Sequence, residues 1–308
     1  MRNKLAEIIY KESLRNSKIC IVVADISPAG SMIDFRAKNP KKFINTGVAE
    51  QSMIGIAAGM ALRGLKPFCY TIATFALYRP FEMIRVDLCY QDLPVTVVGM
   101  GTGTIYSTLG GTHLTQEDIS IARSVPNMNI IAPCDPNELE DAVKYCCNDS
   151  RGPVYLRIGK AGESTFVNKN SEKWKFGKIR KIVPGKDICI LTFGPIINKA
   201  FQLRERLIKE KISVEINSCH TLKPFDYKTL KMKFKKFKKI VIIEDHSKIG
   251  GLNTIVKESA YDQSYKGKIL SFSLKDEFIH CYGNQDDLLN KHGISSKKLY
   301  KKTSEILL

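Results

Sequence analysis

The sequence predicts an α/β protein of two domains, each a mostly parallel sheet flanked by helices. Short apolar runs of strand length alternate with helical patterns along the chain, as is typical of parallel strands buried on both faces. A polar, weakly patterned stretch over residues 160–178 interrupts this alternation, which then resumes. We therefore expect a first domain over residues 1–165, a linker over 166–180 and a smaller second domain over 181–308.

The first domain is expected to alternate strands with helices after an amphipathic N-terminal helix. The predicted strands are KICIVVAD (18–25), PFCYTIAT (67–74), VTVVGM (95–100) and NIIAP (129–133). Helical patterns lie between them at 47–64, 75–90 and 115–125. The last of these begins with Thr115-x-x-Asp118, which is typical of a helix N-terminus.

The second domain repeats the alternation. Its predicted strands are DICILTF (187–193), ISVEINSC (212–219), KKIVIIED (238–245) and GKILSFSL (267–274), and its clearest helix covers 197–210. The lysine-rich segment 228–239 interleaves lysines with Leu230, Met232, Phe234 and Phe237, which predicts a helix or turn with one buried face.

Composition narrows the classes of function. The net charge of +17 makes nucleic acid a candidate partner. No nucleic-acid-binding signature accompanies this charge, so no specific nucleic acid is expected. No apolar run reaches membrane-spanning length. The nine cysteines are scattered and include no C-x-x-C pair, which favours buried thiols in a reducing compartment, the cytoplasm.

Glu50 is the one carboxylate in TGVAEQSMIGIAAGMAL, residues 46–62, a segment that otherwise predicts a buried helix. A buried carboxylate is costly unless it is paired or protonated. The sequence must therefore supply either a partner or a function for Glu50.

Three segments together resemble the pyrimidine-binding domain of transketolase-like, thiamine-diphosphate-dependent enzymes. They are GVAEQSMIGIAAGMALRGLKPFCYTIATFALYRPFEMIR (47–85), GGTHLTQEDISIARSVPNMNIIAPCDPNELEDAV (110–143) and GPVYLR (152–157). CHTLKPFD (219–226) and VIIEDHSKIGGL (241–252) are similar to the transketolase C-terminal domain. The family also includes 1-deoxyxylulose 5-phosphate synthase and the beta subunits of 2-oxoacid dehydrogenases.

The resemblance implies a catalytic role for Glu50: its carboxyl hydrogen-bonds ring nitrogen N1′ of the aminopyrimidine and promotes loss of the proton from C2 of the thiazolium. The cofactor would then offset the burial of Glu50. Phe75, Tyr78 and Phe81 match the family's aromatic positions around the pyrimidine, with Phe75 as the stacking residue. His113 matches a histidine that faces the reacting carbons and shuttles protons.

The resemblance also implies that half of the cofactor site lies elsewhere. The family holds the diphosphate through a divalent metal bound at a G-D-G motif, and no GDG occurs in the chain. We expect a separate N-terminal subunit to carry the diphosphate and Mg²⁺, in an α2β2 assembly with paired beta chains. His246, in EDH, is expected to serve mainly as a second-domain or interface residue.

The chain departs from ordinary transketolases around the substrate. Counted back from His113, a family aspartate that orients donor hydroxyls becomes Leu109, and a phosphate-site histidine becomes Gly101. A family serine falls on Ala29, with Ser31 close enough to substitute.

A family arginine that contacts phosphate falls on Lys160, which keeps the charge but loses the bidentate fork. Arg79 and Arg157 remain either as anion contacts or as structural ion pairs. The candidate substrate contacts are therefore Ser31, Arg79, Leu109, Arg157 and Lys160.

These features predict the C-terminal subunit of a heteromeric transketolase-like enzyme that transfers a two-carbon ketol or acyl unit through a thiamine-diphosphate ylide. The departures favour a non-standard sugar, such as a nucleotide-linked or otherwise modified one. Three alternatives remain open: a conventional sugar-phosphate transketolase subunit, a 2-oxoacid dehydrogenase beta subunit, and a catalytically inactive scaffold or nucleic-acid-binding module.

Overall fold

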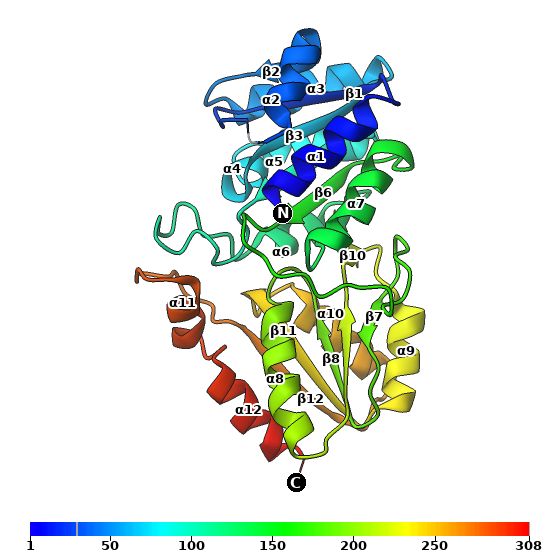
Figure 1. Cartoon of the computed structure of the whole chain (residues 1–308), viewed down its shortest axis with the longest axis vertical. Coiled ribbons are helices and arrows are strands. Elements are labelled where there is room, and N and C mark those ends of the chain that lie inside the picture. Colours follow the sequence, from blue (N-terminus) through cyan, green and yellow to red (C-terminus); the bar gives the residue numbers. More distant parts are fainter. Residues whose placement is uncertain (29, 308) are drawn as a thin grey trace.

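The computed structural model describes residues 1–28 and 30–307. Two α/β domains are stacked end to end, the first in the upper half of Figure 1 and the second in the lower half. The predicted fold class is confirmed.

The first domain is built on a seven-stranded sheet in the order β10-β5-β6-β4-β3-β1-β2. Its strands are β1 (Ile19–Val23), β2 (Phe43–Asn45), β3 (Lys66–Ile72), β4 (Thr96–Met100), β5 (Asn129–Ile131), β6 (Val154–Ile158) and β10 (Thr221–Lys223). All neighbours pair in parallel except β10, which is antiparallel to β5. Every residue of β1, β4 and β6 is buried, because helices cover both faces.

The helical segments of this domain are α1 (Arg2–Ser13), α2 (Met32–Lys38), η1 (Pro40–Lys42), α3 (Glu50–Leu62), α4 (Ala73–Leu77), α5 (Phe81–Met83), the π-helix η2 (Ile84–Tyr90), α6 (Asp118–Ser124) and α7 (Pro136–Asn148). The helix expected over 75–90 is thus interrupted at Pro80, which separates α4 from α5. The segment after Pro80 is continuous and changes from an α-helical turn to the π-helix η2 at Ile84. The helix expected from Thr115 begins only at Asp118.

The second domain has a five-stranded sheet in the order β12-β11-β8-β9-β7. The strands are β7 (Arg180–Val183), β8 (Ile188–Thr192), β9 (Val214–Ser218), β11 (Lys239–Ser247) and β12 (Lys268–Leu274), and only β7 pairs antiparallel. Its helices are α8 (Ile197–Lys209), α9 (Tyr227–Lys236), α10 (Leu252–Asp262), α11 (Gln285–Lys291) and α12 (Ser296–Glu305).

The strand β10 joins the two domains. It lies in the second part of the sequence, yet it completes the first sheet by pairing Thr221 with Ile131 and Lys223 with Ile130. One apolar cluster also continues from the first domain into the second. The candidate site on the first domain therefore rests on a scaffold to which both parts of the chain contribute.

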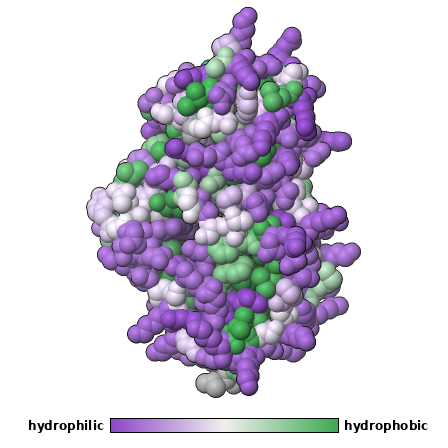
Figure 2. All heavy atoms as spheres, viewed as in Figure 1, coloured by the Kyte–Doolittle hydropathy of each residue, from purple (hydrophilic) through white to green (hydrophobic). Residues whose placement is uncertain are grey.

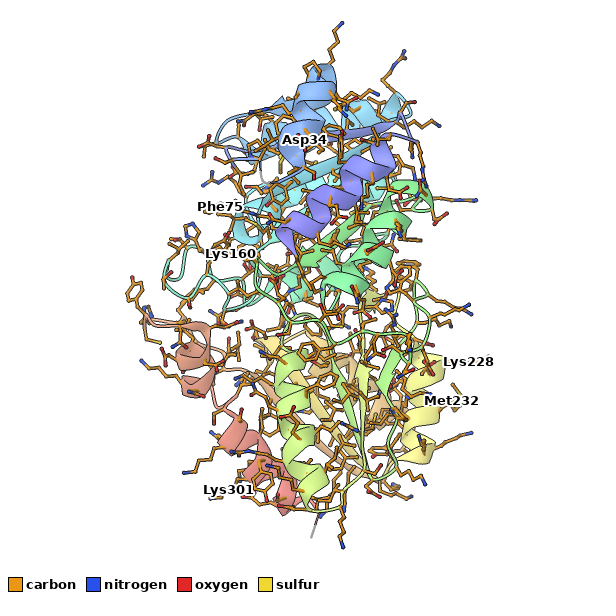
Figure 3. The ribbon with its side chains drawn as sticks, in the orientation of Figure 1. Asp34, Phe75, Lys160, Lys228, Met232 and Lys301 are labelled. Carbon is orange, nitrogen blue, oxygen red and sulfur yellow. The ribbon has the colours of Figure 1, made fainter. Side chains whose placement is uncertain are left out.

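The lysine-rich segment forms α9 and has a mostly solvated face. Leu230, Phe234 and Phe237 are buried as expected, but Met232 is 53% exposed, because it lies on the opposite side of the helix from Leu230 and Phe234. Lys228 and Met232 lie at the edge of the second domain, whereas Phe75 lies on the first (Figure 3). Figure 2 shows a mostly hydrophilic surface on this view. No helix in the described part of the chain is long and apolar enough to cross a membrane.

Candidate active site

The candidate residues gather at one edge of the first sheet. Ser31 follows β1, Glu50 follows β2, Phe75 follows β3, His113 follows β4 and Lys160 follows β6. These strands are consecutive in the order β6-β4-β3-β1-β2, and the carboxyl ends of parallel strands meet at one edge of a sheet. Phe75 and Lys160 lie along the same side of this domain in Figure 3.

Glu50 is the first residue of α3 and is 3% exposed. The helix N-terminus favours a carboxylate at this position. Arg79 donates a hydrogen bond from Nη1 to Glu50 Oε2 at 2.9 Å, and the Arg79 side chain is 48% exposed. The protein itself thus supplies a partner for Glu50, where the sequence suggested only a cofactor.

Phe75 lies on α4 between two polar groups. The Arg79 guanidinium carbon stands 5.7 Å from the centroid of the Phe75 ring, within the range of a cation–π contact. The His113 ring also meets Phe75 edge to face, with centroids 5.3 Å apart at 74°. Phe75 therefore links the Glu50 region to His113.

Tyr78 and Phe81 lie beside this group and pack partly into the core. The Tyr78 hydroxyl donates to Glu117 Oε2 at 2.8 Å and accepts from the Glu117 backbone N–H at 3.3 Å. Burial raises the pKa of Tyr78, so the side chain remains a neutral phenol. Phe81 is half-buried at the start of α5. Glu117, the residue that precedes α6, therefore fixes the orientation of the Tyr78 side chain.

His113 belongs to a row of contacting side chains that continues from Phe75 to Tyr106 and Lys160. Its Nδ1 lies 2.9 Å from Thr112 Oγ1, and its ring meets Tyr106 edge to face at 5.9 Å. The Lys160 ammonium then lies 4.9 Å from the Tyr106 centroid. Motif matching did not identify Tyr106, because no motif contains it.

Tyr106 also explains why residue 101 has no side chain. Gly101 has φ of +71°, and a Cβ placed there would overlap the Tyr106 ring. An imidazole at position 101 is therefore excluded while Tyr106 keeps this position.

Two further candidate substrate contacts lie at the surface or near it. Leu109 is 48% exposed, and Ser31 is half-buried before α2 with no side-chain capping bond. The alternative position, Ala29, lies outside the described residues.

Arg157 lies in the interior, apart from the row formed by Phe75, His113 and Lys160. It is 2% exposed, and its Nε donates to Asp118 Oδ2 at 2.8 Å. Its Nη2 donates to the Asp245 carbonyl at 2.9 Å. This geometry favours the structural ion pair that the sequence left open as an alternative to an anion contact, because the guanidinium is buried and its Nε and Nη2 are both hydrogen-bonded within the protein.

His246 is buried where the domains meet, as expected. Its Nε2 accepts a hydrogen bond from the Ser120 backbone N–H at 3.4 Å and lies 3.8 Å from Asp118 Oδ1. Burial lowers the pKa of His246 to about 4, so the ring is neutral near pH 7.

The gathered groups suit a flat heteroaromatic ligand. A buried carboxyl can hydrogen-bond a ring nitrogen, and half-buried aromatic rings give it apolar walls. An imidazole lies beside them for proton transfer. Within residues 1–28 and 30–307, no group of three or more His, Cys, Asp or Glu side chains is arranged to hold a metal ion. The carboxyl of Glu50, the aromatic rings and the imidazole of His113 are the groups that suit the pyrimidine end of thiamine diphosphate.

Family models support the same assignment over most of the chain. The transketolase pyrimidine-binding domain matches residues 1–162, and the transketolase C-terminal domain matches residues 177–299.

Three relatives align with nearly the whole chain. The chain is 28% identical over 306 residues to one of the subunits of the apulose-4-phosphate transketolase of Phocaeicola vulgatus, covering 99% of this chain and 97% of that protein. It is 33% identical over 306 residues to a putative transketolase C-terminal section of Methanocaldococcus jannaschii, covering 99% and 95%. It is 28% identical over 309 residues to a 6-deoxy-6-sulfo-D-fructose transketolase subunit of a Clostridium species, covering 99% and 94%.

A solved structure is similar over the same extent. It is described as a split gene transketolase, inactive beta4 tetramer, and it superposes with a TM-score of 0.89 at 29% identity. The match covers 99% of this chain and 97% of that one.

Proposed function

Because the chain belongs to the transketolase family, we propose that it is the C-terminal subunit of a heteromeric transketolase-like enzyme that transfers a two-carbon ketol or acyl unit. The observation that carries this proposal is the buried Glu50 at the start of α3, which Arg79 connects to Phe75 and, through the Phe75 ring, to His113. Thiamine diphosphate supplies a carbon nucleophile when bound. Glu50 holds a proton at the pyrimidine N1′, Phe75 stacks on that ring, and His113 holds or moves a proton at the substrate oxygen.

A separate subunit supplies the diphosphate and Mg²⁺ site in this proposal. The chain contains no GDG sequence, and relatives of similar length are described as subunits or as a split gene product. Phe75, Tyr78 and His113 are only half-buried, as expected of residues at a site that a second protein completes.

Two copies of this chain pair in the proposed α2β2 assembly. The helix α3 is apolar on all sides, yet it exposes Gly55, Ile56, Gly59 and Leu62. An all-round apolar helix is normally covered, and both glycines have open space at the Cβ position, which allows another backbone to approach closely. The description of the similar solved structure as a tetramer supports self-association of such chains. The nine free cysteines support a cytoplasmic location.

The sugar substrate is proposed to be a non-standard one, for example nucleotide-linked or otherwise modified. Leu109 is exposed near His113, and Tyr106 fills the space at Gly101, so the family's aspartate and histidine contacts have no counterpart at these positions. Two relatives are named for apulose 4-phosphate and for 6-deoxy-6-sulfo-D-fructose, which are unusual sugars.

Reconstitution tests this function. The purified chain alone should show no turnover and no tight binding of thiamine diphosphate, and addition of the partner subunit should restore both. Full activity of this chain alone would contradict the two-subunit proposal. An assembled complex that binds no thiamine diphosphate would favour a scaffold, and acyl transfer to a lipoyl domain would favour a 2-oxoacid dehydrogenase.

The same complex tests the substrate class through kcat/KM for xylulose 5-phosphate and for modified sugars. Each missing charge-assisted hydrogen bond costs about 1.5–3 kcal/mol, so the terminal phosphate should add little. A preference for xylulose 5-phosphate of several orders of magnitude would identify a conventional transketolase subunit instead.

A further inference from the structure

Arg79 contacts both groups that the proposed function gives to the pyrimidine. Its Nη1 donates to Glu50 Oε2 at 2.9 Å, and its guanidinium carbon lies 5.7 Å from the Phe75 ring centroid. In the described part of the chain, Arg79 is the one side chain that hydrogen-bonds Glu50.

The chemistry of the guanidinium makes Arg79 a mimic of a pyrimidine ring. It is planar and delocalised, it donates hydrogen bonds to carboxylates, and it stacks on aromatic faces. It therefore satisfies the carboxylate and covers the aromatic face at the same time. A pyrimidine that stacks on Phe75 and hydrogen-bonds Glu50 needs the same two surfaces.

Arg79 is also able to leave this position. Its side chain is 48% exposed although Glu50 is 3% exposed, so the guanidinium can rotate toward water without losing its solvation. The residue follows the short helix α4 (Ala73–Leu77) and precedes Pro80, outside any regular helix that would restrict its side chain.

We propose that Arg79 occupies the pyrimidine subsite in the unliganded subunit and lowers cofactor affinity by competing for Glu50 and Phe75. This inference rests on the proposed function. Arg79 acts through Glu50, as a positioning residue: it keeps the carboxylate satisfied until the cofactor replaces it, and binding includes the cost of breaking this ion pair.

The test measures equilibrium binding to the reconstituted complex, with Arg79→Gln as the main variant. Thiamine diphosphate should bind Arg79→Gln about tenfold more tightly than wild type, the order expected when one competing charge-assisted hydrogen bond is removed. Arg79→Lys keeps a cation but loses the planar guanidinium, so its Kd should fall between the two. Arg151→Gln removes the same charge from an exposed site that faces another groove, and it should leave Kd unchanged.

A ligand control separates competition from a general change in the complex. The diphosphate of the hydroxyethylthiazole fragment lacks the pyrimidine, so wild type and Arg79→Gln should bind it equally. Weaker or unchanged thiamine diphosphate binding by Arg79→Gln, or an equal shift with the fragment, would overturn the proposal.

Binding to the wild-type complex distinguishes a failure of the Arg79 proposal from a failure of the proposed function on which it rests. A wild-type complex that fails to bind thiamine diphosphate contradicts the proposed function. Binding by wild type without the gain in Arg79→Gln contradicts the Arg79 proposal alone.

Discussion

Glu50 illustrates how one carboxylate is kept in an apolar helix. Its position at the first residue of α3 places it in the favourable field of the helix N-terminus, and Arg79 satisfies one of its oxygens. A purely structural carboxylate would need neither an open aromatic wall nor a neighbouring imidazole. Arg79 connects Glu50 to the half-buried Phe75 ring, and His113 contacts that ring, which is why replacement of Glu50 should affect turnover more than folding.

Glu50→Gln tests whether the carboxyl of Glu50 is catalytic. The amide preserves shape and can still accept from Arg79, but it cannot hold an exchangeable acid proton at N1′. Turnover of the reconstituted complex at saturating cofactor should fall by about 10²–10⁴-fold, with little change in the unfolding midpoint. Glu82→Gln, an exposed residue of α5, is the matched control. A near wild-type rate would mean that Glu50 is not the catalytic carboxyl.

Phe75→Ala should act on binding instead of chemistry. Loss of the ring removes a stacking surface worth about 0.5–1.5 kcal/mol beyond its buried area, so the Kd for thiamine diphosphate should rise roughly tenfold while kcat at saturation is largely kept. Titration of the complex followed by kinetics at saturating cofactor separates the two effects. A large loss of kcat with unchanged Kd would assign Phe75 to the chemical step.

Among the elements, α6, β6 and β11 are joined by a buried polar link between the domains. Asp118 of α6 accepts from Arg157 Nε and from the Tyr155 hydroxyl of β6, each at 2.8 Å. Arg157 also donates to the Asp245 carbonyl of β11, and the Asp245 carboxylate accepts from the Thr104 backbone N–H at 3.0 Å. Thr104 lies in the segment that leads from β4 to His113. This polar link therefore anchors the start of the loop that carries His113.

Arg157→Met should therefore destabilise the protein instead of changing its substrate preference. It leaves the Asp118 carboxylate buried without its charge partner, which typically costs about 3–5 kcal/mol. Urea unfolding of the subunit measures this cost, and Arg157→Met combined with Asp118→Asn should recover part of it. A stable variant with altered kcat/KM among sugars would instead support an anion contact.

The elements also explain which features the sequence could predict. The strands β1, β4 and β8 are buried along their whole length, so their apolar runs identified them directly. The edge strand β10 has three residues and pairs with a strand about ninety positions earlier, and no local periodicity indicates such a partner. Arg79 lies four residues after Phe75, a spacing that brings side chains together on a helical turn. This spacing is the feature of the sequence from which the contact between Arg79 and Phe75 could have been predicted.

Across the whole molecule, three buried groups give stability a predictable dependence on pH. Burial lowers the pKa of His220 to about 4 and that of His246 to about 4. Burial raises the pKa of Glu244 to about 7, although Ser273 and the Leu252 backbone N–H hydrogen-bond its carboxylate. Each of these groups binds protons differently in the folded and unfolded chain, which links its titration to unfolding.

The signs of these contributions differ. Between about pH 4 and 6.5 the unfolded chain protonates both histidines while the folded chain keeps them neutral, so stability is lost as pH falls through this range. Between about pH 4.5 and 7 the folded chain keeps a proton on Glu244 that the unfolded chain has released, so stability falls as pH rises. The contributions of the two histidines together exceed that of Glu244 below about pH 6.5, so the sum of these three contributions rises with pH up to that value.

We therefore expect the free energy of unfolding of the isolated subunit to rise with pH from about 4.5 to about 6.5. His220→Gln removes one of the rising contributions, so the slope should fall by up to about 1.4 kcal/mol per pH unit. Glu244→Gln removes the opposing contribution and should steepen the slope by a similar amount. Urea titrations at pH 5, 6 and 7 give these slopes independently of any overall loss of stability, because a pH-independent cost shifts all three values equally. Equal slopes for wild type and both variants would show that these groups titrate alike in the folded and unfolded chain.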